Sequence, residues 1–347
     1  MRIAVWSEEV RQEFEDSVKR WGDPLAYEQN WVYLAQCCRR GGWVCSDSYG
    51  WVAVAKDYLG TGRHAAVVPL SADMVDFLPS AMRFLQGEGI RPEVVKHVPV
   101  QYADMLLNQG FAIRRHPTEC ELSTVCLEEL SEDRWPQVLI NIGYISWIKD
   151  ESDCAQWLAR VPDGPLFGDF RYQLRRFCRK YLRNGVEVTE APVTQTTLDV
   201  TNQALHNWLE SVKIRFSQAG RPKVVDFNAC FREPVEALLE FALQHPNDVI
   251  GSVISVGSRP SSIWLGSRIS EVCFGVYILL ADTRVRNLAD FTLYRAICIA
   301  RMLGFQWVNL GGSELRSLYH FKAKLSRINS EHVYTTRHVL DLEWRGG

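Results

Sequence analysis

The sequence predicts an α/β (α+β) protein built from two domains. Its 347 residues exceed what a single hydrophobic core usually holds. Short runs rich in β-branched and aromatic residues alternate with stretches whose apolar residues recur at helical spacing, and glycine and proline stand at the joints. This alternation is typical of layered α/β and α+β domains. Because the pattern changes after residue 126, we divide the chain into residues 1–126 and 127–347.

The first domain combines short strands with amphipathic helices. The expected helices lie at Glu8–Arg20, Tyr27–Arg39, Ala72–Gly87 and Tyr102–Asn108, and the expected strands at Gly50–Lys56, His64–Leu70, Glu93–Lys96, Phe111–Arg115 and Cys120–Val125.

The second domain begins with a basic helix and continues with a more regular order of elements. The expected helices and strands are, in order, Asp169–Asn184 (ended by Gly185), Thr197–Arg215, Glu233–Gln244, the strands Val249–Val256, Ser262–Ser267 and Val272–Ala281, the helix Leu288–Leu303, the strand Phe305–Leu310 and the helix Glu314–Leu325. Three strands, a helix, a strand and a helix form the order found in the acyltransferase core called GNAT.

Composition and charge exclude several classes of protein. Lysine and arginine number 39 against 41 aspartate and glutamate residues, so any contact with RNA must come from a local patch. The charged N-terminus does not resemble a signal peptide, and no apolar run reaches the length of a membrane span, so we expect a cytoplasmic protein without a membrane partner. The ten cysteines and eight histidines show no metal-ligand spacing, so we expect free thiols and no metal.

The stretch Asn309-Leu-Gly-Gly-Ser-Glu314 joins the last expected strand to the last expected helix. Ser313 stands where an N-cap residue belongs, and Glu314 lies in the first turn, where negative charge is favoured. On a helical wheel Lys322 falls within the apolar arc, whereas Lys324 lies outside it. A buried ammonium is costly unless a negative group meets it, so Lys322 is a candidate for holding a carboxylate, a phosphate or a developing oxyanion. The alternative is a lysine that snorkels to water.

The basic helix indicates a phosphate-bearing partner. It carries six cations and no acidic residue between its first and last arginine: Arg171, Arg175, Arg176, Arg179, Lys180 and Arg183. Four of the arginines repeat at spacing i+4, and like charges at that spacing repel by about 0.2–0.5 kcal/mol per pair. A phosphate partner would reverse this cost. The alternative is a solvated face neutralised by acidic neighbours.

The turn that would hold coenzyme A lacks the residues for that role. Acetyl-CoA enzymes of the GNAT fold cradle pyrophosphate with an Arg-x-x-Gly-x-Gly/Ala turn, because small residues let backbone N–H groups and the helix N-terminus reach the anion. The corresponding turn here, Ala281–Asp290, contains no glycine. We therefore expect no cofactor at this position.

The turn at Asn309–Ser313 and the pair Phe321-Lys322 resemble the C-terminal domain of the Fem peptidyltransferases and of lysyl-phosphatidylglycerol synthases, together with their soluble natural-product relatives. The basic helix followed by Gly185-Val186 also matches, as does Tyr27–Trp31. The resemblance covers most of residues 165–335 and is thinner over the first 125. It implies two GNAT-like domains in tandem, the first degenerate, and an aminoacyl-tRNA donor. It also places Lys322 at the reacting centre.

We therefore expect an aminoacyltransferase that moves an aminoacyl group from tRNA to a small-molecule amine or hydroxyl, in natural-product biosynthesis. Lys322 is the candidate electrostatic stabiliser, and Asn309, Ser313 and Glu314 could orient the reactants or accept a proton. The six cations of the basic helix and Lys324 are the candidate tRNA contacts. Two alternatives remain, an acyl-CoA-dependent N-acyltransferase with a degenerate phosphate loop and a non-catalytic module that docks RNA or protein.

Overall fold

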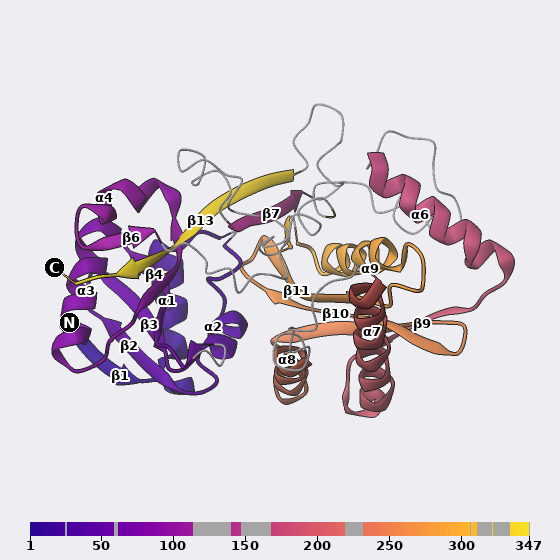
Figure 1. Ribbon diagram of the computed structural model, residues 1–347, viewed down its shortest axis with the longest axis horizontal. Coiled ribbons are helices and arrows are strands. Elements are labelled where there is room, and N and C mark those ends of the chain that lie inside the picture. Colours follow the sequence, from indigo (N-terminus) through magenta and orange to yellow (C-terminus); the bar gives the residue numbers. More distant parts are fainter. Residues whose placement is uncertain are drawn as a thin grey trace. The chain divides into compact units, whose positions relative to one another are not determined.

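The computed structural model describes residues 1–24, 26–58, 62–113, 140–146, 168–218, 232–305, 307–310, 321 and 334–346. The chain divides into two compact units. The first unit comprises Met1–Ile142 and the chain's last segment, Thr336–Gly347, and the second contains Gly143–Gly311. The expected boundary between residues 126 and 127 lies outside the described residues. In each unit, helices cover a set of hydrogen-bonded strands (Figure 1).

The first unit has the strand order β1-β2-β3-β4-β5-β13, with β6 paired to β13. Its strands are β1 (Arg2–Val5), β2 (Gly42–Ser46), β3 (Gly50–Ala55), β4 (Ala65–Ser71), β5 (Val94–Pro99), β6 (Phe111–Ile113) and most of β13 (Tyr334–Trp344). Its helices are α1 (Arg11–Trp21), α2 (Trp31–Cys37), α3 (Met74–Gly87) and α4 (Ala103–Leu107).

Helices cover both faces of this first sheet. Every residue of β3 is buried. Trp51 meets Phe14 of α1, whereas Val52 and Val54 pack in the core cluster that contains α3. A strand buried on both faces carries a nearly continuous apolar run, which is why Gly50–Ala55 was recognisable from sequence.

The second unit has the strand order β7-β12-β11-β10-β9-β8. Its strands are β8 (Val188–Pro192), β9 (Val249–Val256), β10 (Arg259–Arg268), β11 (Cys273–Ala281), β12 (Trp307–Asn309) and most of β7 (Ile140–Ser146). Its helices are α6 (Gly168–Lys180), α7 (Leu198–Gln218), α8 (Glu233–Gln244) and α9 (Leu288–Met302). The helices α6 and α9 lie on one face of this sheet, and α7 and α8 lie on the other (Figure 1).

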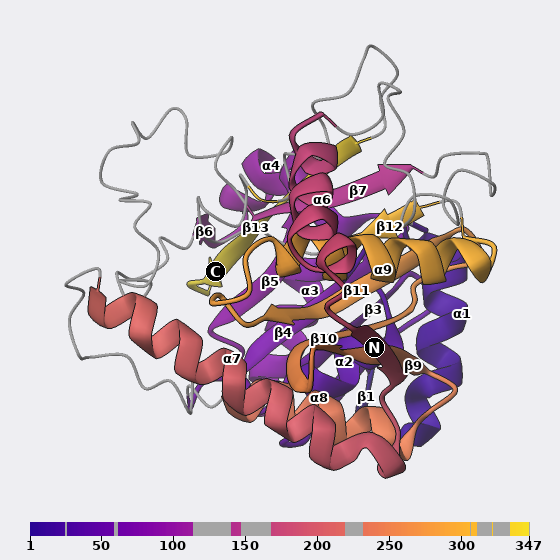
Figure 2. The same ribbon diagram turned by 90° about the vertical axis from the view of Figure 1, so that its right-hand side faces the viewer.

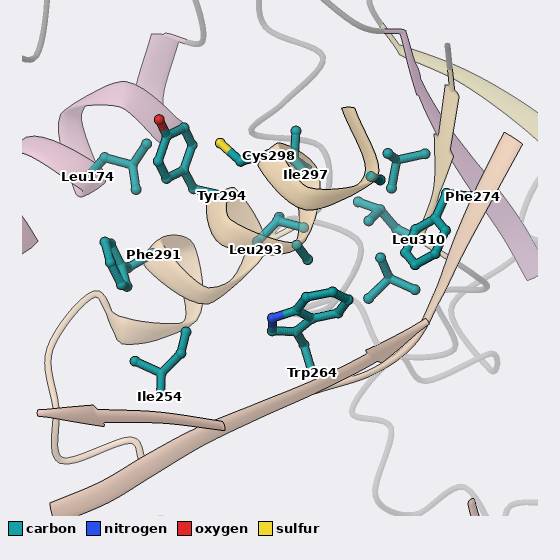
Figure 3. Close-up of a cluster of buried hydrophobic side chains, with 14 of the residues drawn as sticks. Leu174, Ile254, Trp264, Phe274, Phe291, Leu293, Tyr294, Ile297, Cys298 and Leu310 are labelled. Atoms are coloured by element: carbon teal, nitrogen blue, oxygen red, sulfur yellow. The ribbon is translucent and has the colours of Figure 1, made fainter. Parts of the chain in front are cut away.

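The core of the second unit lies between the sheet and α9. Figure 3 shows Trp264 of β10 beneath Phe291 and Leu293 of α9, with Leu174 of α6 against the same helix. These side chains are all buried, so α9 is the central helix of this unit.

The two units repeat one plan. In each, four strands paired antiparallel in succession (β1 to β4, β8 to β11) lead into a helix (α3, α9) and then into a strand parallel to the fourth (β5, β12). A further strand then pairs antiparallel with that last strand, β13 in the first unit and β7 in the second. The tandem arrangement expected from the sequence is therefore present.

Most of the expected elements are confirmed within one to four residues. The helix at Tyr27–Arg39 is shorter than expected, because Asn30 caps α2 by accepting a hydrogen bond from the Val32 N–H. The strands β1, β2, β7, β8 and β13 were not expected. The expected strand Cys120–Val125 and the expected helix Glu314–Leu325 lie outside the described residues, apart from Phe321.

Candidate functional site

The parallel strands β11 and β12 of the second unit part at Asn309. Their pairing runs over three positions and ends at Gly275 and Asn309. Beyond that point β12 ends, whereas β11 continues from Val276 to Ala281. A ligand that enters between parted strands can be held by backbone N–H and C=O groups.

Asn309 lies on the sheet face opposite α9. Its neighbour Val308 and the facing residue Phe274 both belong to the core around α9. Because side chains alternate along a strand, Asn309 and its register partner Gly275 point to the other face. The Asn309 side chain is fully buried there. The structure thus places this expected site residue at the point where the strands part.

Two hydroxyl groups missed by the sequence analysis lie on the same face. The register between β10 and β11 shifts at Leu265 and Gly266, so Tyr277 is the extra residue of a β-bulge. Its hydroxyl accepts a hydrogen bond of 3.1 Å from Ser267 Oγ. A Cβ atom added to Gly275 would lie 3.4 Å from the Tyr277 hydroxyl oxygen, so this pair lies beside the end of the strand pairing. In the sequence, this pair of hydroxyl groups is marked only by Gly275, two residues before Tyr277.

The turn between β11 and α9 is closed by contacts with the rest of the unit. The Thr283 N–H donates to Ser211 Oγ at 3.0 Å, and the Arg284 N–H donates to Asp282 Oδ1 at 3.0 Å. The Val285 N–H donates to the Asp282 carbonyl at 3.0 Å. A phosphate cradle requires N–H groups that point at the ligand. In this turn three backbone N–H groups already donate hydrogen bonds within the protein, and one of them donates to the carboxylate of Asp282.

Asp282 is a buried anion held between two guanidinium groups. Arg284 donates to both of its carboxylate oxygens at 2.8 Å, and Arg259 Nη2 lies 3.2 Å from Oδ2. The hydrogen bond and the charge of Asp282 raise the pKa of Arg284 above its ordinary value. Because Arg284 also donates to the Asn207 carbonyl, the turn is fixed to α7.

The basic helix α6 packs on α9 and on this turn (Figure 2). Its buried residues are Leu174, Phe177 and Cys178, and the Phe177 ring stacks on Phe291 with centroids 4.4 Å apart. At the turn, the Asn287 side chain donates a hydrogen bond to Gln173. The apolar face of α6 is therefore fixed, and its cations lie on the remaining surface.

The cations of α6 differ in exposure. Arg179, Lys180 and Arg183 are exposed, Arg175 and Arg176 are half-buried, and the Arg171 side chain lies outside the described residues. The α-helix ends at Lys180, so Arg183 stands on the following 3-10 turn, which Gly185 caps with a left-handed φ of 72°. Within the described part of the chain, no acidic side chain pairs with Arg176, Arg179, Lys180 or Arg183. The i+4 stripe expected from sequence is thus interrupted at its last member.

Four expected site residues lie outside the described residues: Ser313, Glu314, Lys322 and Lys324. Phe321 is described, and it packs half-buried against the core of the second unit.

Across the described ranges, no cluster of three or more His, Cys, Asp or Glu side chains could hold a metal ion. No helix in those ranges is long and apolar enough to span a membrane.

Solved structures with the same fold were found across the whole chain. FemX matches with a TM-score of 0.54 at 10% identity, covering 99% of this chain and 97% of that chain. The C-terminal domain of a protein assigned as a lysylphosphatidylglycerol synthetase from Agrobacterium fabrum matches with a TM-score of 0.52 at 13% identity, covering 97% and 92%. A tandem GNAT protein from the clavulanic acid biosynthesis pathway matches with a TM-score of 0.51 at 9% identity, covering 100% and 99%.

The chain has the tandem GNAT fold. No protein-family profile and no curated protein sequence match it. The resemblance to Fem and lysyl-phosphatidylglycerol synthase proteins is therefore confirmed as a likeness of fold, at identities too low to carry residue roles.

Proposed function

We propose that this tandem GNAT protein is an aminoacyltransferase that moves an aminoacyl group from tRNA to a small-molecule amine or hydroxyl. The observation that carries the proposal is the cationic surface of α6, where Arg176, Arg179, Lys180 and Arg183 have no acidic partner among the described residues. Grouped cations repel one another, and a phosphate backbone turns that cost into binding. Arg171, Arg175 and Lys324 are the further proposed RNA contacts.

The closed turn before α9 supports an RNA-borne donor over an acyl-CoA donor. A pyrophosphate would have to displace the Asp282 carboxylate from the Arg284 N–H and from two guanidinium groups. It would also meet a buried negative charge, which repels it. An acyl-CoA-dependent N-acyltransferase is the second candidate. It requires this turn to open, so saturable binding of CoA would favour it.

The proposed chemistry is attack on an ester that is already activated. The acceptor nitrogen or oxygen bonds to the ester carbonyl carbon and its proton passes to a base. The bond from that carbon to the ribose oxygen then breaks, and the ribose oxygen takes the proton from the base and leaves as a hydroxyl. Positioning, a proton acceptor and charge stabilisation are the needs of such a step. We assign charge stabilisation to Lys322, and orientation or proton transfer to Asn309, Ser313 and Glu314. No metal or cofactor is part of the proposal.

We assign catalysis to the second domain, expected at residues 127–347, and a degenerate GNAT-like scaffold to residues 1–126, which the last segment, Thr336–Gly347, joins in the first unit. The likeness of fold to the C-terminal domain assigned as a lysylphosphatidylglycerol synthetase supports an aminoacyl donor. The likeness to a clavulanic acid pathway protein supports a role in natural-product biosynthesis. We propose the cytoplasm as its location, where charged tRNA is present.

The test is release of label from charged tRNA. Purified protein is incubated with tRNAs carrying radiolabelled amino acids and with fractions of small metabolites, and acid-precipitable label is followed. We expect one charged tRNA to lose label faster than its own hydrolysis, with the label appearing in a small molecule. If the protein binds charged tRNA and no label leaves in any combination, the non-catalytic binding module replaces this proposal.

A further inference from the structure

An exposed aromatic ring stands at the start of the cationic face of α6. The Tyr172 side chain is 55% exposed, although its helix buries Leu174, Phe177 and Cys178. The Arg176 guanidinium lies over the Tyr172 ring, 5.4 Å from the ring centroid. The ring thus contacts a cation one turn further along the helix, and more than half of the tyrosine remains exposed to solvent.

Tyr172 lies on the same side of α6 as the half-buried Arg176 and the exposed Lys180. Residues four and eight positions apart follow one side of an α-helix, so Tyr172, Arg176 and Lys180 stand in a row. With a rise of 1.5 Å per residue, this row is about 12 Å long. Lys180 also lies over an aromatic ring, 5.2 Å from the Tyr181 centroid. An aromatic ring therefore lies beside each of the two cations of the row.

We propose that this surface binds an unpaired segment of RNA, with one base stacked on Tyr172 beside Arg176 and the neighbouring phosphates against Arg179, Lys180 and Arg183. This inference rests on the proposed function and narrows the part of the tRNA that α6 recognises to a single strand. It assigns to Tyr172 a base-binding role that charge alone does not supply.

The chemistry of the row favours a single strand over a duplex. Cations contact phosphates in either form, whereas an aromatic ring can stack only on a base whose face is free. In a duplex the bases are stacked on one another, so an exposed tyrosine gains nothing. An acidic protein segment would use the cations in a similar way, but it offers no planar base to the ring.

The test is fluorescence anisotropy with two labelled RNAs. One is a hairpin closed by a synthetic linker without bases and carrying a four-nucleotide unpaired 3′ end, and the other is the same linker-closed hairpin with a blunt end. Each is titrated with the parent protein and with the variants Tyr172→Ala and Tyr172→Phe. Tyr49→Ala is the matched control, because Tyr49 is 70% exposed on the first unit. Circular dichroism confirms the fold of each variant.

Loss of one stacked base costs roughly 1–3 kcal/mol, so Tyr172→Ala should weaken binding of the overhanging RNA by about 5- to 150-fold. Tyr172→Phe keeps the ring and should bind like the parent, as should Tyr49→Ala. The salt dependence should be unchanged, because no cation is removed. Binding of the blunt hairpin should be the same in all four proteins.

Three results would overturn the inference. Tyr172→Ala could bind the overhanging RNA like the parent, the parent could bind both hairpins equally, or a polyglutamate peptide could compete as well as RNA. In the first two cases the proposed function stands, because the cations still bind RNA. A parent protein that binds neither RNA removes the proposed function as well.

Discussion

Two buried carboxylates, Asp282 and Asp341, fix local structure in the two units. Asp282 holds Arg259 and Arg284 in the second unit. In the first unit, Asp341 of β13 pairs with Lys96 of β5, and both side chains are almost fully buried. The pairing of β5 with β13 contains a bulge, in which two residues of β5, Lys96 and His97, lie opposite Asp341. His97 adopts a left-handed φ of 61° there. Removing one partner of such a pair leaves a buried charge uncompensated.

Asp341→Ala should therefore lower the free energy of unfolding of the first unit by about 3–5 kcal/mol. The double variant Lys96→Met/Asp341→Leu should recover most of this loss, because apolar side chains of similar size can replace a buried pair. Urea unfolding, with hydrogen exchange of first-unit peptides, measures both. A loss below about 1 kcal/mol in the single variant would contradict a buried, mutually dependent pair.

The proposed role of Lys322 is to stabilise charge while the ester is attacked, and a single substitution tests it. If its ammonium stabilises charge only while the ester is attacked, Lys322→Met should lower turnover by about 10²–10³-fold and leave donor affinity nearly unchanged. Lys324→Met is the matched control, since the wheel places Lys324 outside the apolar arc. Single-turnover rates and tRNA binding are the measurements. Small, equal losses in both variants would mean that Lys322 only snorkels to solvent.

The sequence indicates candidate site residues where a polar side chain follows directly from a local pattern, such as the end of a strand. Asn309 was singled out near the end of an apolar strand before a glycine pair, and the pairing of β11 and β12 ends at this residue, whereas its role in a site stays a prediction. Ser267 and Tyr277 were missed, because their hydrogen bond joins two strands across a bulge. A pattern read along one strand does not reveal which residue of a neighbouring strand a bulge will face.

At the scale of elements, α6 and the turn before α9 were the most predictable. The apolar spacing of α6 and the glycine after its 3-10 turn are local signals, and both are confirmed. The absence of a CoA site at the glycine-free turn stays a prediction, and the structure adds that the Asp282 carboxylate accepts a hydrogen bond from the Arg284 N–H there. The break of the arginine stripe after Lys180 was not predictable, because α and 3-10 turns share the same sequence preferences.

Arg179→Ala/Arg183→Ala should weaken tRNA binding, because both side chains are exposed and have no acidic partner among the described residues. Each lost phosphate contact should also reduce the slope of log affinity against log salt by roughly 0.7–0.9. The control is Arg232→Ala, an exposed cation paired with Glu236 on α8. Binding curves at several salt concentrations that overlay the parent would remove α6 from the RNA-binding surface.

At the scale of the whole molecule, the last strand is the main feature that the sequence did not predict. β13 follows the second unit along the chain, yet it pairs with β5 and β6 of the first unit. The Lys96–Asp341 pair spans 245 positions of sequence. Local periodicity indicates a strand but not its partner, so only the structure assigns Thr336–Gly347 to the first unit.

Deleting residues 336–347 should therefore destabilise the first unit and not the second. The deletion removes the partner of β6, the buried Leu342 and the counter-ion of Lys96. Hydrogen exchange followed by mass spectrometry should show lost protection in β3, β4 and β5, and kept protection in β10, β11 and α9. Unchanged protection of the β5 peptides would contradict this assignment.

Exchange of the acyl donor distinguishes an aminoacyl-tRNA donor from an acyl-CoA donor. The same labelled amino acid is supplied either on its tRNA or as a coenzyme A thioester, with one set of acceptor amines, and transferred label is measured in a single turnover. We expect this result: product forms from the charged tRNA alone, and calorimetry detects no saturable binding of CoA. Product from the thioester, or tight CoA binding at the Asp282 turn, would contradict it.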